Sequence, residues 1–174
     1  MENQIINDLL MKLPTLLPAM ALIAMLSFSC STETFEDDFN NETISTYVPP
    51  TKSIEIEILE LINNYRITNG LSALNDMSTI KAQAFGHTDY MIENDEVSHA
   101  NFYQRRQNLV NQAGAQAVAE NVAYAFSSAE SVVNAWLNSE GHKANIEGDF
   151  TDFDISAELD ENGKWYYTNI FIKK

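Results

Sequence analysis

The feature that most restricts the fold of this chain is its single cysteine, which ends its only long apolar run. The run covers residues 13–28, carries no charge and follows one basic residue, Lys12. It is too short and too oddly flanked to predict a membrane-spanning helix. With one cysteine, the chain forms no intramolecular disulfide and no cysteine-based zinc cluster. If the protein is exported, it must therefore be held together by core packing.

The junction at Ser29-Cys30 resembles a bacterial lipoprotein signal, in which cleavage leaves an acylated cysteine at the new N-terminus. Leu26 stands one place further from the cysteine than usual, as in relaxed signals of the Bacteroidota, and the acidic run at 33–38 resembles their surface-export tether. We expect residues 11–29 to be the signal and Cys30 to anchor the protein in the envelope, at the outer membrane or cell surface of a Gram-negative bacterium. The alternatives are an ordinary secretory signal or an uncleaved anchor.

Residues 1–10 contain Glu2 and Asp8 and no basic residue, whereas a signal peptide begins with positive charge. We therefore expect Met11 to be the true start and residues 1–10 to be a misassigned start. N-terminal sequencing of the unprocessed precursor should begin at Met11. A peptide containing residues 5–8 in that precursor would contradict the expectation.

Residues 30–51 are rich in Ser, Thr, Asn and acids and end near Pro49-Pro50, which predicts a flexible tether before one domain at 52–174. The whole chain has 174 residues and is 45% hydrophobic, enough for one packed core. Its 25 acidic and 10 basic residues give a net charge of -15. Since nucleic-acid binding needs a basic face, we expect no nucleic-acid partner. We also expect the protein to be a monomer.

Apolar residues at helical spacing predict four helices, at about 53–69, 76–91, 102–112 and 127–141. Along one side of the third lie Phe102, Arg106, Leu109 and Val110. Patterns rich in β-branched and aromatic residues predict strands at 117–126, 150–159 and 164–172, and Asn162-Gly163 predicts a hairpin between the last two. This order predicts an α+β domain whose helices cover a small, mainly antiparallel sheet.

Three histidines and one carboxylate are the candidate site residues. His87 lies on the apolar stripe of the second helix and is predicted to be a core residue, whereas His99 and His142 are predicted in loops that can face a cleft. Glu120 falls in an apolar run, where a carboxylate needs a partner, either a backbone amide or Arg, or one of the histidines. Two imidazoles and a carboxylate can bind a divalent ion or act as general acid and base, although each alone is more often structural.

Three blocks, in this order, resemble the CAP superfamily of cysteine-rich secretory, antigen 5 and pathogenesis-related 1 proteins, and in particular its bacterial SCP-like branch. The blocks are Ser98-His99-x-x-Phe102-x-x-Arg105, Ala119-Glu120-Asn121-Val122-Ala123 and Trp136-x-x-Ser139-x-Gly141-His142-x-x-Asn145-Ile146. The resemblance covers residues 54–174. It implies a three-layer α-β-α sandwich with a large central cleft.

In this family the cleft holds two histidines and two acids, and several members bind a divalent metal there. By motif His99, His142 and Glu120 match three of these residues, which implies a metal site with zinc as the expected ion and water or Glu140 as a further ligand. Ser139 occupies the place of the second acid, and Glu140 would point about 100° away from it around a helix. The resemblance therefore implies a weaker metal site, or one filled by water.

Members of the family share no enzymatic activity; they are lipid or sterol binders, signalling or defence proteins, and in some cases proteases. We expect an envelope lipoprotein whose cleft binds a small ligand, lipid, glycan or peptide, rather than an enzyme. One alternative is a metal-dependent hydrolase or protease that uses His99, Glu120 and His142, although the chain has no HExxH helix and no Gly-x-Ser-x-Gly motif. A structural adhesion domain is the other.

A separate acidic cluster, formed by Asp149, Asp152 and Asp154, stands at the start of a predicted strand. It lacks the spacing of an EF-hand loop. We therefore expect a solvated acidic face rather than a calcium site.

Overall fold

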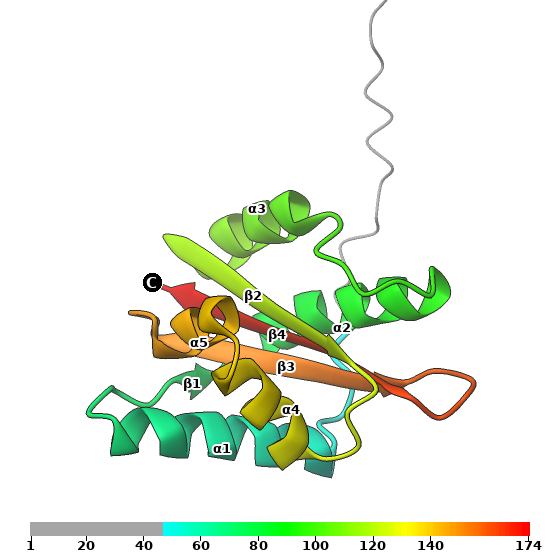
Figure 1. Cartoon of the computed structure of the whole chain (residues 1–174). Helices are drawn as coiled ribbons and strands as arrows, with labels where there is room; N and C mark the ends of the chain where they lie inside the picture. Colours follow the sequence, from blue (N-terminus) through cyan, green and yellow to red (C-terminus); the bar gives the residue numbers. More distant parts are fainter. Residues whose placement is uncertain (1–46) are drawn as a thin grey trace, which may run out of the picture. The chain divides into compact units, whose positions relative to one another are not determined.

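Helices cover both faces of a four-stranded sheet in residues 47–174, the part of the chain that the computed structural model describes (Figure 1). The predicted signal, Cys30 and most of the tether lie outside these residues. The elements are α1 (Ser53–Thr68), β1 (Asn75–Asp76), α2 (Ser78–Glu93), α3 (Phe102–Ala113), β2 (Ala117–Tyr124), α4 (Ala129–Leu137), α5 (Glu140–Glu147), β3 (Asp152–Leu159) and β4 (Trp165–Lys173). In this described part, no helix has the length and apolarity needed to cross a membrane.

The sheet has the strand order β1-β3-β4-β2. The short strand β1 pairs parallel with β3, whereas β3 with β4 and β4 with β2 pair antiparallel. Strands β3 and β4 form the predicted hairpin, in which Gly163 takes a left-handed conformation at φ 71°. The predicted α+β class and mainly antiparallel sheet are thus confirmed.

Side chains of the strands alternate between two cores, because successive residues of a strand point to opposite faces. On one face Phe153 and Phe171 pack with α1, α4 and α5, and on the other Ile170 and Ile172 pack with α2 and α3. Figure 1 shows α4 and α5 in front of the strands and α2 behind them. This is the three-layer sandwich that the family resemblance implied.

A buried ion pair joins the two helical layers around one edge of the sheet. Glu55 of α1 is fully buried, and its Oε1 lies 2.6 Å from Nζ of Lys81, which is 2% exposed on α2. The same pair satisfies the backbone of β3, since Glu55 accepts from the Ala157 amide (2.8 Å) and Lys81 donates to the Ile155 carbonyl (2.7 Å). Because β1 pairs only as far as Phe153, the two side chains cover the part of β3 that β1 leaves unpaired.

The fourth predicted helix is in fact two helices. α4 ends at Leu137, Ser139 is extended (φ -105°, ψ 119°), and α5 begins at Glu140. The prediction that His142 lies in a loop after Gly141 is therefore wrong, because both residues lie in the first turn of α5. The overlooked signal is Ser139-Glu140, since serine before a helix and an acid in its first turn are typical of a helix start.

The prediction of a solvated acidic face is wrong for two of its three residues. The side chain of Asp149 is 90% exposed, but Asp152 and Asp154 are only 5% and 7% exposed. Asp154 accepts hydrogen bonds from the backbone amides of Ile155 (2.8 Å) and Met77 (3.3 Å), which ties the start of α2 to β3. Burial raises the pKa of Asp154 to about 6.

Replacing Lys81 with methionine should leave the buried carboxylate of Glu55 without its closest cation, so that only Nζ of Lys52 remains, 3.8 Å from Oε1. We expect Lys81→Met to lower the free energy of unfolding by about 3–5 kcal/mol in urea denaturation. Lys143→Met is the matched control, because Lys143 pairs with Glu147 at 3.6 Å on the surface and its loss should cost less than about 1 kcal/mol. Equal and small losses in both variants would contradict a stabilising role for the buried pair.

Candidate functional site

The candidate site lies along β2, the strand at the edge of the sheet opposite β1. Two carbonyls of β2 are covered by side chains of the neighbouring helices: Trp136 Nε1 donates to Val122 (3.2 Å), and Asn145 Nδ2 donates to Glu120 (3.2 Å). The side chain of Glu120 points toward α3, whereas that of the next residue, Asn121, points toward α5. The strand therefore carries polar groups on both of its faces.

Glu120 is 6% exposed and forms a bidentate pair with Arg105 of α3. Arg105 Nε lies 2.8 Å from Oε2 and Arg105 Nη2 lies 2.8 Å from Oε1. Arg105 Nη1 also donates to the carbonyl of Ala100 (2.6 Å), which fixes the loop before α3. Burial alone would raise the pKa of Glu120, but hydrogen bonds from His99 and Arg105 outweigh burial and lower it, so the carboxylate is ionised at neutral pH.

His99 lies in a loop, as predicted, and its Nδ1 is 2.8 Å from Oε1 of Glu120. Because an ionised carboxylate only accepts hydrogen bonds, Nδ1 of His99 must be the donor. This contact fixes the ring, and in the neutral imidazole it leaves a lone pair on Nε2. Since the side chain of His99 is 53% exposed, an oriented imidazole faces the solvent side of the site. Of the partners expected for Glu120, which were a backbone amide or an arginine, or one of the two histidines, its side chain contacts Arg105 and His99.

His142 reaches the site from α5, on the other face of β2. Its Nδ1 lies 2.8 Å from the hydroxyl oxygen of Ser139, so the serine in the place of the family's second acid orients this ring. Burial, followed by the nearby charge of His99, lowers the pKa of His142 and favours its neutral form.

His87 is a core residue, as predicted, and is 2% exposed. Its Nε2 lies 2.8 Å from the Ser98 carbonyl, which makes Nε2 the donor and anchors the loop that carries His99. Its Nδ1 has no hydrogen-bond partner in the described residues. Burial, together with the charge of Arg105, lowers the pKa of His87 to about 4.

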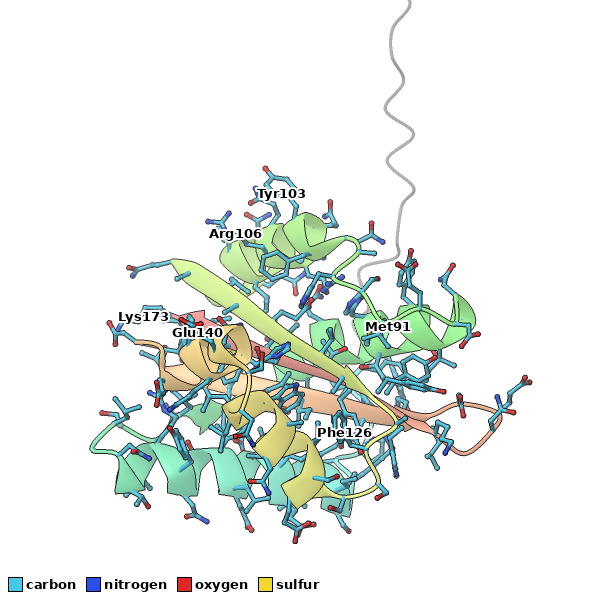
Figure 2. All side chains as sticks on the ribbon, in the orientation of Figure 1. Met91, Tyr103, Arg106, Phe126, Glu140 and Lys173 are labelled. Atoms are coloured by element: carbon cyan, nitrogen blue, oxygen red, sulfur yellow. The ribbon has the colours of Figure 1, made fainter. Side chains whose placement is uncertain are left out.

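The family resemblance implied a metal site formed by His99, His142 and Glu120, but the structure does not bring three free ligands together. Both carboxylate oxygens of Glu120 are engaged by Arg105 and His99, and Glu140 is exposed on the first turn of α5 (Figure 2). In residues 47–174 no group of three or more His, Cys, Asp or Glu side chains is placed to hold a metal ion. Two imidazoles are fewer than the three or four protein ligands of ordinary zinc sites. The three-ligand set with Glu120 therefore does not fit the geometry.

The sequence pattern placed Arg106 along the same side of α3 as Phe102, Leu109 and Val110 and assigned no role to Arg105. Arg105 is buried, whereas Arg106 is partly exposed and extends outward with Tyr103 (Figure 2). The buried carboxylate of Glu120 was the available signal, because it requires a cation. Asn121 and Asn145 are part of the family motifs, but the residue pattern alone indicates no role for either.

Comparison with known proteins defines the class of the chain. Residues 59–171 match the model of the cysteine-rich secretory protein family, CAP. The chain therefore belongs to this family.

Individual proteins of known sequence or structure are also similar to this chain. The chain is 34% identical over 124 residues to an uncharacterized membrane protein of Bacillus subtilis, YlbC; the match covers 69% of this chain and 34% of that protein, so the chain spans about a third of the relative's length. An outer surface protein of Borrelia burgdorferi has the same fold, with a TM-score of 0.65, 22% identity, and coverage of 74% of this chain and 98% of that one. An extracellular protein with an SCP domain from Bacillus anthracis gives a TM-score of 0.60 at 26% identity, covering 72% of this chain and 45% of that one.

Two buried groups should give the unfolding free energy opposite dependences on pH. His87 has a pKa of about 4 in the fold against 6.5 ordinarily, so between these values the unfolded chain binds more protons and the fold loses stability as pH falls. Asp154 has a pKa of about 6 against 3.8, so there the folded chain binds more protons and gains stability as pH falls. Each contribution is about 3 kcal/mol, and the two nearly cancel.

Removing either group should expose the contribution of the other. From pH 6.5 to pH 4, the unfolding free energy of His87→Gln should rise relative to wild type, and that of Asp154→Asn should fall relative to wild type. Urea denaturation at several pH values in this interval measures both changes. Parallel profiles for wild type and both variants would contradict the opposed contributions.

Proposed function

We propose that this chain is an exported, lipid-anchored protein of the cell envelope whose CAP domain binds a ligand at His99 and His142. The observation that carries the binding proposal is the exposed imidazole of His99, held through Nδ1 by an ionised, buried Glu120. Export and anchoring are supported by the apolar run that ends at Cys30. They are also supported by the descriptions of two similar structures, one as an outer surface protein and one as an extracellular protein.

The chemistry of the two rings narrows the class of ligand. Nε2 of His99 is an acceptor in the neutral ring, so a fitting ligand presents a hydroxyl or an amide N–H to it. Glycans, sterols and peptides carry such donors. Because each ring is already fixed by a hydrogen bond to Glu120 or Ser139, little side-chain entropy is lost when a ligand binds.

A hydrolase is the second candidate, and one contact favours it. A carboxylate that orients a histidine through Nδ1, as Glu120 does with His99, is the arrangement of a general base and its orienting group. In that case Nε2 of His99 would take a proton from a water molecule. Ligand binding remains the first proposal, because it needs only the groups that the site contains.

Thermal-shift measurements on residues 31–174 test the binding proposal with a panel of envelope glycan fragments, sterols, short peptides and zinc. A ligand present at 100 times its Kd should stabilise the wild type by about 2.7 kcal/mol. His99→Ala/His142→Ala should remove this stabilisation. Tyr103→Ala, which removes an exposed side chain of α3, should retain it.

Three results separate the alternatives. No response of the wild type to the panel, or an equal response of the double variant, would contradict binding at the histidines. Turnover of a peptide or ester library that is lost in His99→Ala would favour the hydrolase. Equal zinc content in the purified wild type and double variant would remove the predicted metal site.

A further inference from the structure

The block Glu120-Asn121 contributes two side chains to the site, and the proposed function uses only the first. Asn121 is fully buried, and its amide contacts α5 at two points. Nδ2 of Asn121 donates to the carbonyl of His142 (3.1 Å), and Oδ1 accepts from Nδ2 of Asn145 (2.8 Å). The same nitrogen of Asn145 also donates to the carbonyl of Glu120 (3.2 Å), so α5 and β2 are joined by three hydrogen bonds.

These contacts fix both the position and the rotation of α5. His142 and Asn145 are three residues apart, so they lie on one face of the helix, one turn from each other. A side chain that binds the helix at both points prevents it from sliding along its axis and from rolling about it. The position and rotation of α5 together determine the direction in which the side chain of His142 projects.

Many of the other contacts of α5 lie at its C-terminal end, where the hydroxyl of Tyr65 also donates to Glu147 (2.6 Å). The helix has eight residues, fewer than an isolated helix needs for stability in water, and Ile146 is its only buried residue. Arg66 binds the far end of α5, where its Nη1 donates to the carbonyls of Ile146 (2.6 Å) and Gly148 (2.9 Å). The turn that carries His142 is held by Ser139 from within the helix start, and the amides of Asn121 and Asn145 attach it to β2.

We infer that Asn121 is a positioning residue, which together with Asn145 sets the place of His142 relative to His99. The inference rests on the proposed function of the two histidines. Consecutive residues of a strand point to opposite faces, so Glu120 fixes His99 from one face and Asn121 fixes His142 from the other. One planar peptide unit joins these two residues, and the relative placement of the imidazoles is built on that rigid unit.

An amide suits this position because it both donates and accepts. Aspartate has nearly the same shape but has no N–H for the carbonyl of His142, and its charge would be buried beside that carbonyl oxygen. Alanine removes both contacts without adding a charge. Alanine variants therefore isolate the role of the contacts.

The test compares Asn121→Ala and Asn145→Ala with Asn169→Ala. Asn169 is the matched control: it is fully buried, lies opposite Asn121 in the register of β2 and β4, and donates to the carbonyl of Asp154 (2.8 Å). Nuclear magnetic resonance at a fixed pH of about 7.5, well above the ordinary pKa of histidine, follows the ring resonances of His142 and the exchange of backbone amides. Asn145 is only partly buried, so its variant decides the question if Asn121→Ala does not fold.

In both variants at the α5 contact, the ring resonances of His142 should shift and the amides of α5 should exchange at least about tenfold faster, with wild-type rates retained in β3 and β4. Asn169→Ala should leave the His142 ring and α5 unchanged. Unchanged His142 and α5 signals in Asn121→Ala and Asn145→Ala would overturn the inference, and so would equal changes in all three variants. The proposed function is judged separately, because these signals need no bound ligand.

Discussion

The bidentate contact between Arg105 and Glu120 is the interaction on which the rest of the site depends. Glu120 is buried on an edge strand, where burial alone would favour its protonated form. The guanidinium supplies two N–H donors to the carboxylate, which stays ionised and can hold the ring of His99. A buried carboxylate without this cation would take up a proton or leave the core, and the imidazole would lose its fixed orientation.

Polar side chains also attach helices to the two edges of the sheet, whereas apolar side chains attach them to its faces. At one edge of the sheet, Glu55 and Lys81 cover backbone groups of β3, and at the other edge Trp136 and Asn145 cover carbonyls of β2. Covered edges do not pair with strands of other molecules. At β2 the same contacts carry the site, so protection of the edge and placement of the histidines share one set of side chains.

Membership of the CAP family accounts for the fold but does not determine the chemistry of the site. Ser139 occupies the position of the second acid that the resemblance implied, and it orients His142 instead of supplying a ligand. Both carboxylate oxygens of Glu120 already accept hydrogen bonds from Arg105 and His99. In each ring Nδ1 is engaged by a neighbouring side chain, Glu120 for His99 and Ser139 for His142. The proposed recognition of a ligand through these rings needs no third protein ligand.

The sequence by itself determined the class of fold, the burial of His87 and the loop position of His99, because these depend on periodicity and on neighbours within one segment. It also indicated that Glu120 needs a partner. Only the tertiary structure decided which groups meet. Arg105 is buried because it contacts Glu120 of β2. Asp154 is buried because it accepts from the amide of Met77, which lies far from it in the sequence. His142 is held in place by Asn121, which lies 21 residues earlier and contacts α5 because β2 lies beside that helix in the folded domain.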